Sequence, residues 1–142
     1  MMPSVQNPLD SETLFTTILD DIRSTRQLTR QHYLSLFLLF RRPSIAALDI
    51  LDKKQVSKLH SPSGRQIFQV HSQKALYFCM LDTRYCTCPG FLASAICQRN
   101  VLMCKHILAC YIADSLCCAE EKAVGEREMA ELMVEKIHLD SR

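Results

Sequence analysis

Two closely spaced pairs of possible metal ligands constrain the fold of this chain more than any other feature of its sequence. Cys86-x-Cys88 is followed, after fifteen residues, by Cys104-x-His106. Three thiols and one imidazole form a ligand set that structural zinc sites commonly use. If these four residues bind one ion, the fold must bring two separate short segments to a single point.

The geometry of regular elements predicts how each pair is presented. Residues two apart on a helix point about 200° away from each other, so we expect Cys104 to precede a helix whose first turn carries His106. Residues two apart on a strand share a face, so we expect Cys86 and Cys88 at a strand end, before a turn at Pro89-Gly90. Four protein ligands predict a closed structural site, because catalytic zinc usually keeps an open position.

The remaining cysteines leave alternatives open. Free cysteines are often buried as small apolar side chains, and the motif thiols could be of this kind. Cys110, one turn after His106, is the substitute ligand we consider. A disulfide framework is disfavoured, because we see no signal peptide and the chain is 48% hydrophobic, enough for an ordinary core. The cysteines without ligand spacing are Cys79, Cys97, Cys110, Cys117 and Cys118.

Apolar spacing predicts a helical N-terminal region over residues 1–53. It favours helices over 10–24, with Asp10 or Ser11 as N-cap, and over 31–40, followed by a short helix restarting at Pro43. The run Tyr33–Phe40 is shorter than the roughly 20 apolar residues that a membrane span requires. We therefore expect it to form a buried helix.

Residues 54–118 change in character. Strands are predicted over 56–60 and 65–71 around the turn Ser61-Pro62-Ser63-Gly64, with a third strand over 75–81. We place the core of a zinc finger at 76–114, with a short helix over 91–97, a loop at 98–100 and a helix over 105–119. Residues 119–142 are predicted as a charged amphipathic helix. The expected fold is α+β, with a small antiparallel sheet of about three strands leading into a ββα-like finger, in one compact body.

The pattern Cys-x-Cys-x15-Cys-x-His, between a strand and a helix, resembles the SWIM-type zinc finger family. Its flanks, over roughly residues 30–115, resemble SWIM proteins that are subunits of Shu complexes: Ala47–Asp52, Ser61–Arg65, Phe68–Val70, Tyr85–Pro89 and Cys104–His106. The resemblance implies one structural Zn²⁺ held by Cys86, Cys88, Cys104 and His106.

The same resemblance implies a function. It predicts a nuclear, non-enzymatic subunit that pairs as a heterodimer with a RecA-like recombinase paralog, an ATPase. The pair would promote recombinase filament assembly in homologous recombination, in repair of DNA double-strand breaks and in meiosis. The chain has no Gly-x4-Gly-Lys-Ser/Thr phosphate loop, so nucleotide hydrolysis would belong to the partner. We expect no small-molecule substrate and no membrane partner.

Two further hypotheses concern surfaces. The net charge of +2 excludes a polycationic nucleic-acid binder, so any direct DNA contact would be local, through Arg84, Arg99 and Lys105. Protein docking could use Tyr33–Phe40 or the stripe of the last helix that includes Leu132 and Met133, unless both face the chain's own core.

Overall fold

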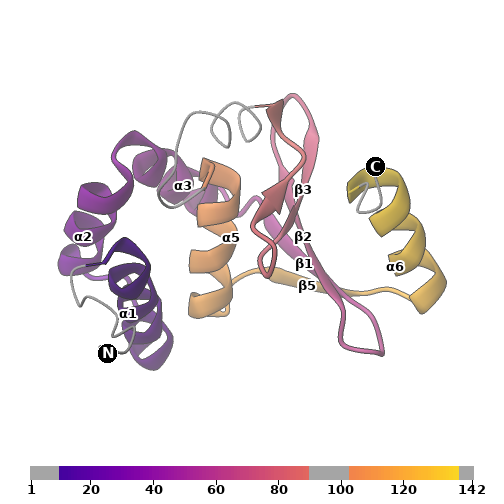
Figure 1. The fold of residues 1–142 in the computed structure, drawn as a ribbon, viewed down its shortest axis with the longest axis horizontal. Helices are drawn as coiled ribbons and strands as arrows, with labels where there is room; N and C mark the ends of the chain where they lie inside the picture. Colours follow the sequence, from indigo (N-terminus) through magenta and orange to yellow (C-terminus); the bar gives the residue numbers. More distant parts are fainter. Residues whose placement is uncertain (1–9, 90–102, 138–142) are drawn as a thin grey trace, which may run out of the picture.

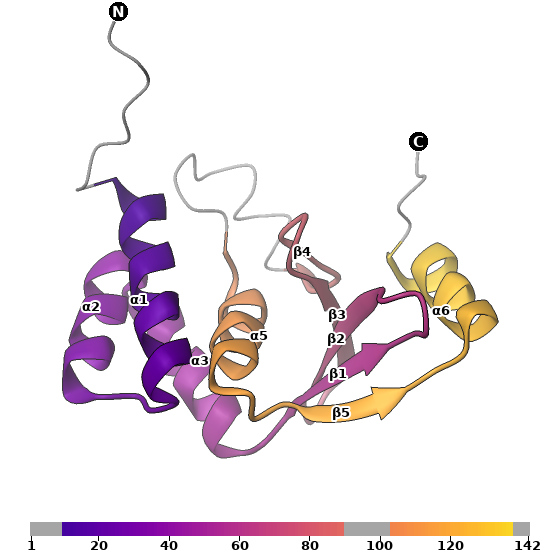
Figure 2. The same cartoon turned by 90° about the horizontal axis from the view of Figure 1, so that it is seen from below.

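The computed structural model describes residues 10–89 and 103–137. A sheet lies between two unequal helical layers (Figure 1). Helices α1, α2, α3 and α5 gather on one face of the sheet, with α5 between the other three and the strands, and α6 covers the opposite face. The same arrangement is seen in the orthogonal view of Figure 2.

The N-terminal helices form where the sequence predicts them. Helix α1 spans Ser11–Thr25, and the Asp10 carboxylate caps it by accepting a hydrogen bond from the Thr13 amide. Helix α2 spans Arg30–Phe40, and α3 spans Arg42–Asp52 with proline in its first turn. A capping box formed by Thr29 and His32 starts α2, because each side chain bonds the other's backbone amide.

The sheet has five strands in the order β4-β3-β2-β1-β5. The hairpin turns where expected, with the Gly64 amide donating to the Ser61 carbonyl at 2.9 Å and Gly64 at φ +93°. Neighbouring strands are antiparallel except β5, which runs parallel to β1. The strands are Val56–His60 (β1), Gln66–His71 (β2), Leu76–Met80 (β3), Tyr85–Cys86 (β4) and Glu120–Ala123 (β5).

The α+β class is confirmed, but the sheet is larger than the expected three strands. Strand β4 extends one edge, and β5 extends the other from within the segment predicted to be only helix. Every residue of β5 is exposed, so it has no alternating apolar pattern. Its strand conformation comes from pairing with the open edge of β1, which is tertiary context that a local pattern does not carry.

Helix α5 spans Lys105–Leu116, and the last helix is α6, Glu126–Leu132, continued by a π-helical turn, η1, at Met133–Ile137. Met129 and Ile137 are fully buried against the sheet face formed by Leu59, Ile67, Phe78 and Met80. The stripe of the last helix therefore faces the chain's own core, and Leu132 and Met133 are half-buried in the same cluster.

Helix α2 differs from the prediction of a buried helix. Leu36 is buried and Leu39 and Phe40 are half-buried, but the other face of the helix is open to solvent. Tyr33, Leu34, Phe37 and Leu38 are all exposed. Helix α2 therefore has one face packed in the core and one face exposed to solvent, and both faces are apolar.

Several predictions lie outside the described residues: the helix over 91–97, the loop at 98–100, and with them Cys97 and Arg99. Among the described residues, no helix has the length and apolar character needed to cross a membrane. No disulfide joins the cysteines of the described ranges.

Candidate metal centre

The end of the β3–β4 hairpin positions the first pair of thiols. Cys86 pairs with Cys79 across the two strands. One residue on, Thr87 bonds Phe78 twice, its amide donating to the Phe78 carbonyl and its hydroxyl accepting from the Phe78 amide, each at 3.1 Å. The Cys88 amide then turns back and donates to Cys86 Sγ at 3.4 Å. The backbone therefore tightens just after the strand, as expected.

The start of α5 positions the second pair. Cys104 is the N-cap residue, with extended backbone, and its Sγ accepts a hydrogen bond from the Ile107 amide at 3.5 Å. His106 lies in the first turn. This is the arrangement that the two-residue spacing predicts. Because Cys104 precedes the helix, its side chain can point toward the same site as His106, which two residues within a helix could not do.

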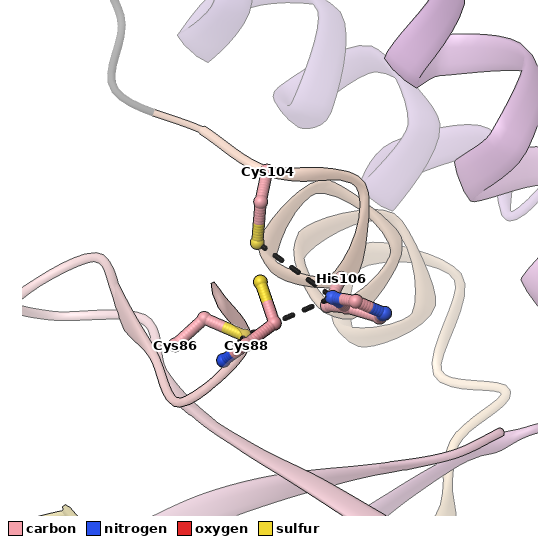
Figure 3. Close-up of side chains that lie close together, drawn as sticks. All are labelled: Cys86, Cys88, Cys104 and His106. Carbon is pink, nitrogen blue, oxygen red and sulfur yellow. Dashed lines mark hydrogen bonds between the residues drawn. The ribbon is translucent and has the colours of Figure 1, made fainter. Parts of the chain in front are cut away.

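The four side chains converge. Figure 3 shows the thiols of the hairpin end pointing toward Cys104 and the His106 ring at the helix start. His106 Nδ1 lies 3.8 Å from Cys86 Sγ and 3.9 Å from Cys104 Sγ. One ligand atom from each residue falls within 4.8 Å of the other three, and all four residues are buried. Within the described ranges, this is the one such group of possible metal ligands.

These distances match a tetrahedral ion. Zn–S bonds of about 2.3 Å and Zn–N bonds of about 2.0 Å place sulfur and nitrogen about 3.5 Å apart in a tetrahedron. The observed 3.8 and 3.9 Å lie close to that separation. The group therefore fits one structural Zn²⁺, with His106 Nδ1 facing the ion and Nε2 left to carry the ring proton.

The protein by itself opposes charged thiolates at this point. The hydrogen bond with Cys86, a further one with Cys88 and burial raise the pKa of Cys104 far above that of an ordinary thiol. For Cys86 the hydrogen bond with Cys104 lowers the pKa, but hydrogen bonds with Cys79 and Cys88 and burial outweigh it, so its pKa is raised as well. A divalent cation held by these residues would supply the positive charge that stabilises the thiolates, with release of their protons.

Cys110, the substitute ligand we considered, lies outside the group of four. It is fully buried, and its hydrogen-bonding interaction with Cys79, together with burial, raises the pKa of the Cys79 thiol against the opposing effect of Cys86. Cys79 and Cys110 thus pack behind the site as a second layer of thiols. The Tyr77 ring on β3 lies 4.5 Å from the His106 ring, centroid to centroid, and restricts its orientation.

Of the three cations suggested for DNA contact, Arg84 has a different role. Its guanidinium pairs with the Glu12 carboxylate on α1, and its Nε donates to the Tyr111 hydroxyl at 3.2 Å. A phosphate would have to displace Glu12 to reach it. Lys105 is exposed at the start of α5. No local pattern indicates Glu12 as the partner of Arg84, because the two residues lie 72 positions apart in the sequence.

Comparison with known proteins agrees with this geometry. The SWIM zinc finger family model matches residues 77–113, which run from the second residue of β3 through most of α5 and contain all four converging residues. The strand end, the helix start and the Cys₃His group thus define a SWIM zinc finger.

Similarity to whole proteins extends well beyond the finger. Zinc finger SWIM domain-containing protein 7 of Mus musculus is 32% identical over 125 residues, which cover 87% of this chain and 82% of the mouse protein. The protein of that name from Homo sapiens is 27% identical over 128 residues, covering 89% and 91%. That from Danio rerio is 30% identical over 121 residues, covering 82% and 86%. The chain belongs to the zinc finger SWIM domain-containing protein 7 family.

Proposed function

We propose that this chain is a non-enzymatic, zinc-binding adaptor subunit of a Shu-type complex. In the nucleus it pairs with a RecA-like recombinase paralog and promotes recombinase filament assembly in homologous recombination, during repair of DNA double-strand breaks and in meiosis. Family membership supports the adaptor role, and the resemblance of the finger and its flanks to Shu-complex SWIM subunits supports the pathway.

The observation that carries the proposal is the closed metal centre. Cys86, Cys88, Cys104 and His106 would each give one ligand, and all four are buried, so the ion would have no position for a substrate. Zinc then acts by holding the hairpin end to the start of α5. Structural zinc contributes about 10–16 kcal/mol of apparent binding free energy, comparable to the whole stability of a domain.

Purification of the tagged protein from its native cells tests this proposal. Mass identification of co-purifying proteins and metal analysis of the same sample should give a RecA-like ATPase and one zinc per chain. If zinc is present without the ATPase, the adaptor role fails while the metal centre stands. If zinc is absent, the reading of the metal centre fails.

A second candidate function, direct nucleic-acid contact, is favoured by a groove beside the metal centre. An open pocket of about 410 Å³ is lined by the three cations Lys53, Lys74 and Lys105, together with Tyr77 and His106. Lys53 forms an ion pair with Asp49, with 3.1 Å between Nζ and Oδ2. Lys74 and Lys105 are therefore the stronger candidates for phosphate contact. Of the cations that the sequence suggested for DNA contact, Lys105 lines this groove, and Arg99 lies outside the described residues.

Fluorescence anisotropy with a labelled single-stranded oligonucleotide tests the groove. The affinity should fall steeply between about 50 and 200 mM salt, because phosphate contacts release counterions. The K74E/K105E variant should lose most of the binding, whereas K122E, on exposed β5, should retain it. Binding that ignores salt, or that survives K74E/K105E, would exclude the groove as the contact.

A further inference from the structure

The exposed face of α2 forms a continuous stripe. Arg30, Tyr33, Leu34, Phe37, Leu38 and Arg41 recur at helical spacing, so they follow one side of the helix and its C-cap. The apolar members form the centre, and an arginine stands at each end. We call these six residues the α2 stripe.

The α2 stripe points away from the protein's own core. Tyr33 is 46% exposed, Leu34 57% and Leu38 66%, whereas Leu36, on the opposite side of the helix, is fully buried. Both views place α2 at the outer margin of the helical layer (Figures 1 and 2). Scattered single apolar residues are normal on a surface, but a contiguous apolar patch indicates a binding site.

The stretch of sequence that carries the stripe has charges of one sign only, although Asp21, just before it, contacts His32 on α2. The segment from Ile22 to Leu48 contains five arginines and no aspartate or glutamate, in a chain whose net charge is only +2. At the C-terminal end of the stripe, the Arg41 guanidinium lies 5.7 Å from the centroid of the Phe37 ring. The apolar surface is therefore bordered directly by positive charge, which selects against positively charged occupants.

We infer that the α2 stripe binds a short apolar segment of the partner ATPase that carries acidic side chains at both ends; this rests on the proposed adaptor function. Arg30 and Arg41 are eleven residues apart, which is about 16 Å along a helix. The complementary segment is therefore an amphipathic helix of about three turns, or an equivalent extended strand, with carboxylates at about that separation. Apolar burial supplies affinity, and the two ion pairs fix register.

A second copy of this chain fits the stripe poorly. If two α2 stripes packed in parallel, Arg30 would face Arg30 and Arg41 would face Arg41. If they packed antiparallel, each Arg30 would face an Arg41. Either arrangement brings like charges together beside a desolvated surface, which costs several kcal/mol.

The test compares how exposed substitutions on two faces of the molecule change its binding to the separately purified RecA-like ATPase. L34E/L38E places charge in the centre of the stripe, and R30E/R41E reverses its ends. V134E is the matched control, because Val134 is 60% exposed and lies on η1, beyond the opposite face of the sheet. Zinc content and circular dichroism show whether each variant is folded, and isothermal titration gives the affinity.

L34E/L38E should weaken binding at least a hundredfold, R30E/R41E at least tenfold with loss of salt dependence, and V134E less than twofold. If the wild type binds the ATPase and folded L34E/L38E binds equally well, the inference is overturned and the adaptor function stands. If the wild type does not bind the ATPase, both fail. Dimerisation of the chain alone, or binding to phosphatidylserine vesicles, that L34E/L38E abolishes would assign the stripe to a different occupant and overturn the inference.

Discussion

Arg84, in the turn between β3 and β4, forms an ion pair with Glu12 on the first turn of α1, with 2.8 Å between Nη2 and Oε1. The same guanidinium bonds the Tyr111 hydroxyl of α5, which donates to the Leu81 carbonyl at 2.6 Å. The turn that leads into the metal centre is thereby joined to α1 and α5, two helices of the larger helical layer. Arg84 connects the finger to the helical region.

Removing this ion pair should cost stability in a pH-dependent way. The hydrogen bond from Arg84 lowers the pKa of Glu12 below its ordinary value of 4.5. The stabilisation is therefore complete above the unfolded-state pKa and is lost as the pH falls through the lower folded-state pKa. Glu12 is half-exposed, so we expect a coupling free energy of about 1 kcal/mol or less. A double-mutant cycle with E12Q and R84Q, by urea unfolding, should give a larger coupling at about pH 7 than at about pH 4. An equal coupling at both would contradict the ion pair's role.

C104S should separate metal binding from helix capping. Serine is a favoured N-cap residue, so α5 keeps its cap while the site loses a thiolate. We expect bound zinc to fall from one per chain to nearly none, and the finger to lose cooperative unfolding, because the zinc free energy rivals total domain stability. Plasma mass spectrometry and thermal melts measure both effects. C118S, at an exposed thiol, is the control and should keep its zinc. Full zinc in C104S would remove Cys104 from the ligand set.

M129A should loosen α6 without disturbing the metal. Met129 is fully buried against Leu59 and Ile67, and truncation of a buried methionine costs about 2–5 kcal/mol. Hydrogen exchange should rise in α6 and urea unfolding should shift, while zinc content stays at one per chain. V134A, at an exposed position of the same helical segment, should change stability by less than about 0.5 kcal/mol. Equal effects of the two variants would argue against the packing of α6 on the sheet.

G64A should destabilise the hairpin for conformational reasons alone. Gly64 has φ +93°, and a Cβ built there meets nothing within 4 Å, so the penalty is backbone strain and not a clash. We expect about 1 kcal/mol from thermal or urea unfolding. G64N should cost less, because asparagine tolerates positive φ better than alanine. If G64A proves more stable than G64N, the turn adopts another conformation in solution.

The metal centre could be predicted from sequence because local rules determine its halves. Residue spacing alone places Cys104 before a helix and Cys86 at a strand end, and each observed position follows from helix or strand geometry. The orientation of His106 and the thiol layer of Cys79 and Cys110 could not be predicted, because they depend on how α5 packs on β3.

Features that depend on contacts between distant parts of the chain were harder to predict from the sequence. Helix α2 consists mostly of apolar residues, so its periodicity gives little indication of which side meets α3. Arg84 carries the charge of a phosphate ligand, and only the tertiary fold reveals that Glu12 neutralises it. The residues of β5 are charged or exposed, and they form a strand because β1 offers them unpaired backbone groups.

Strand β5 therefore has a consequence for shortened forms of this protein. A chain that ended before Glu120 would retain the helical layer and both halves of the metal centre. It would also leave the outer edge of β1 unpaired and, without α6, the apolar face around Ile67 exposed to water. An open strand edge beside an apolar face is a template for intermolecular pairing. Premature termination near the C-terminus is thus expected to yield aggregates that chaperones and proteases clear, instead of a smaller working protein.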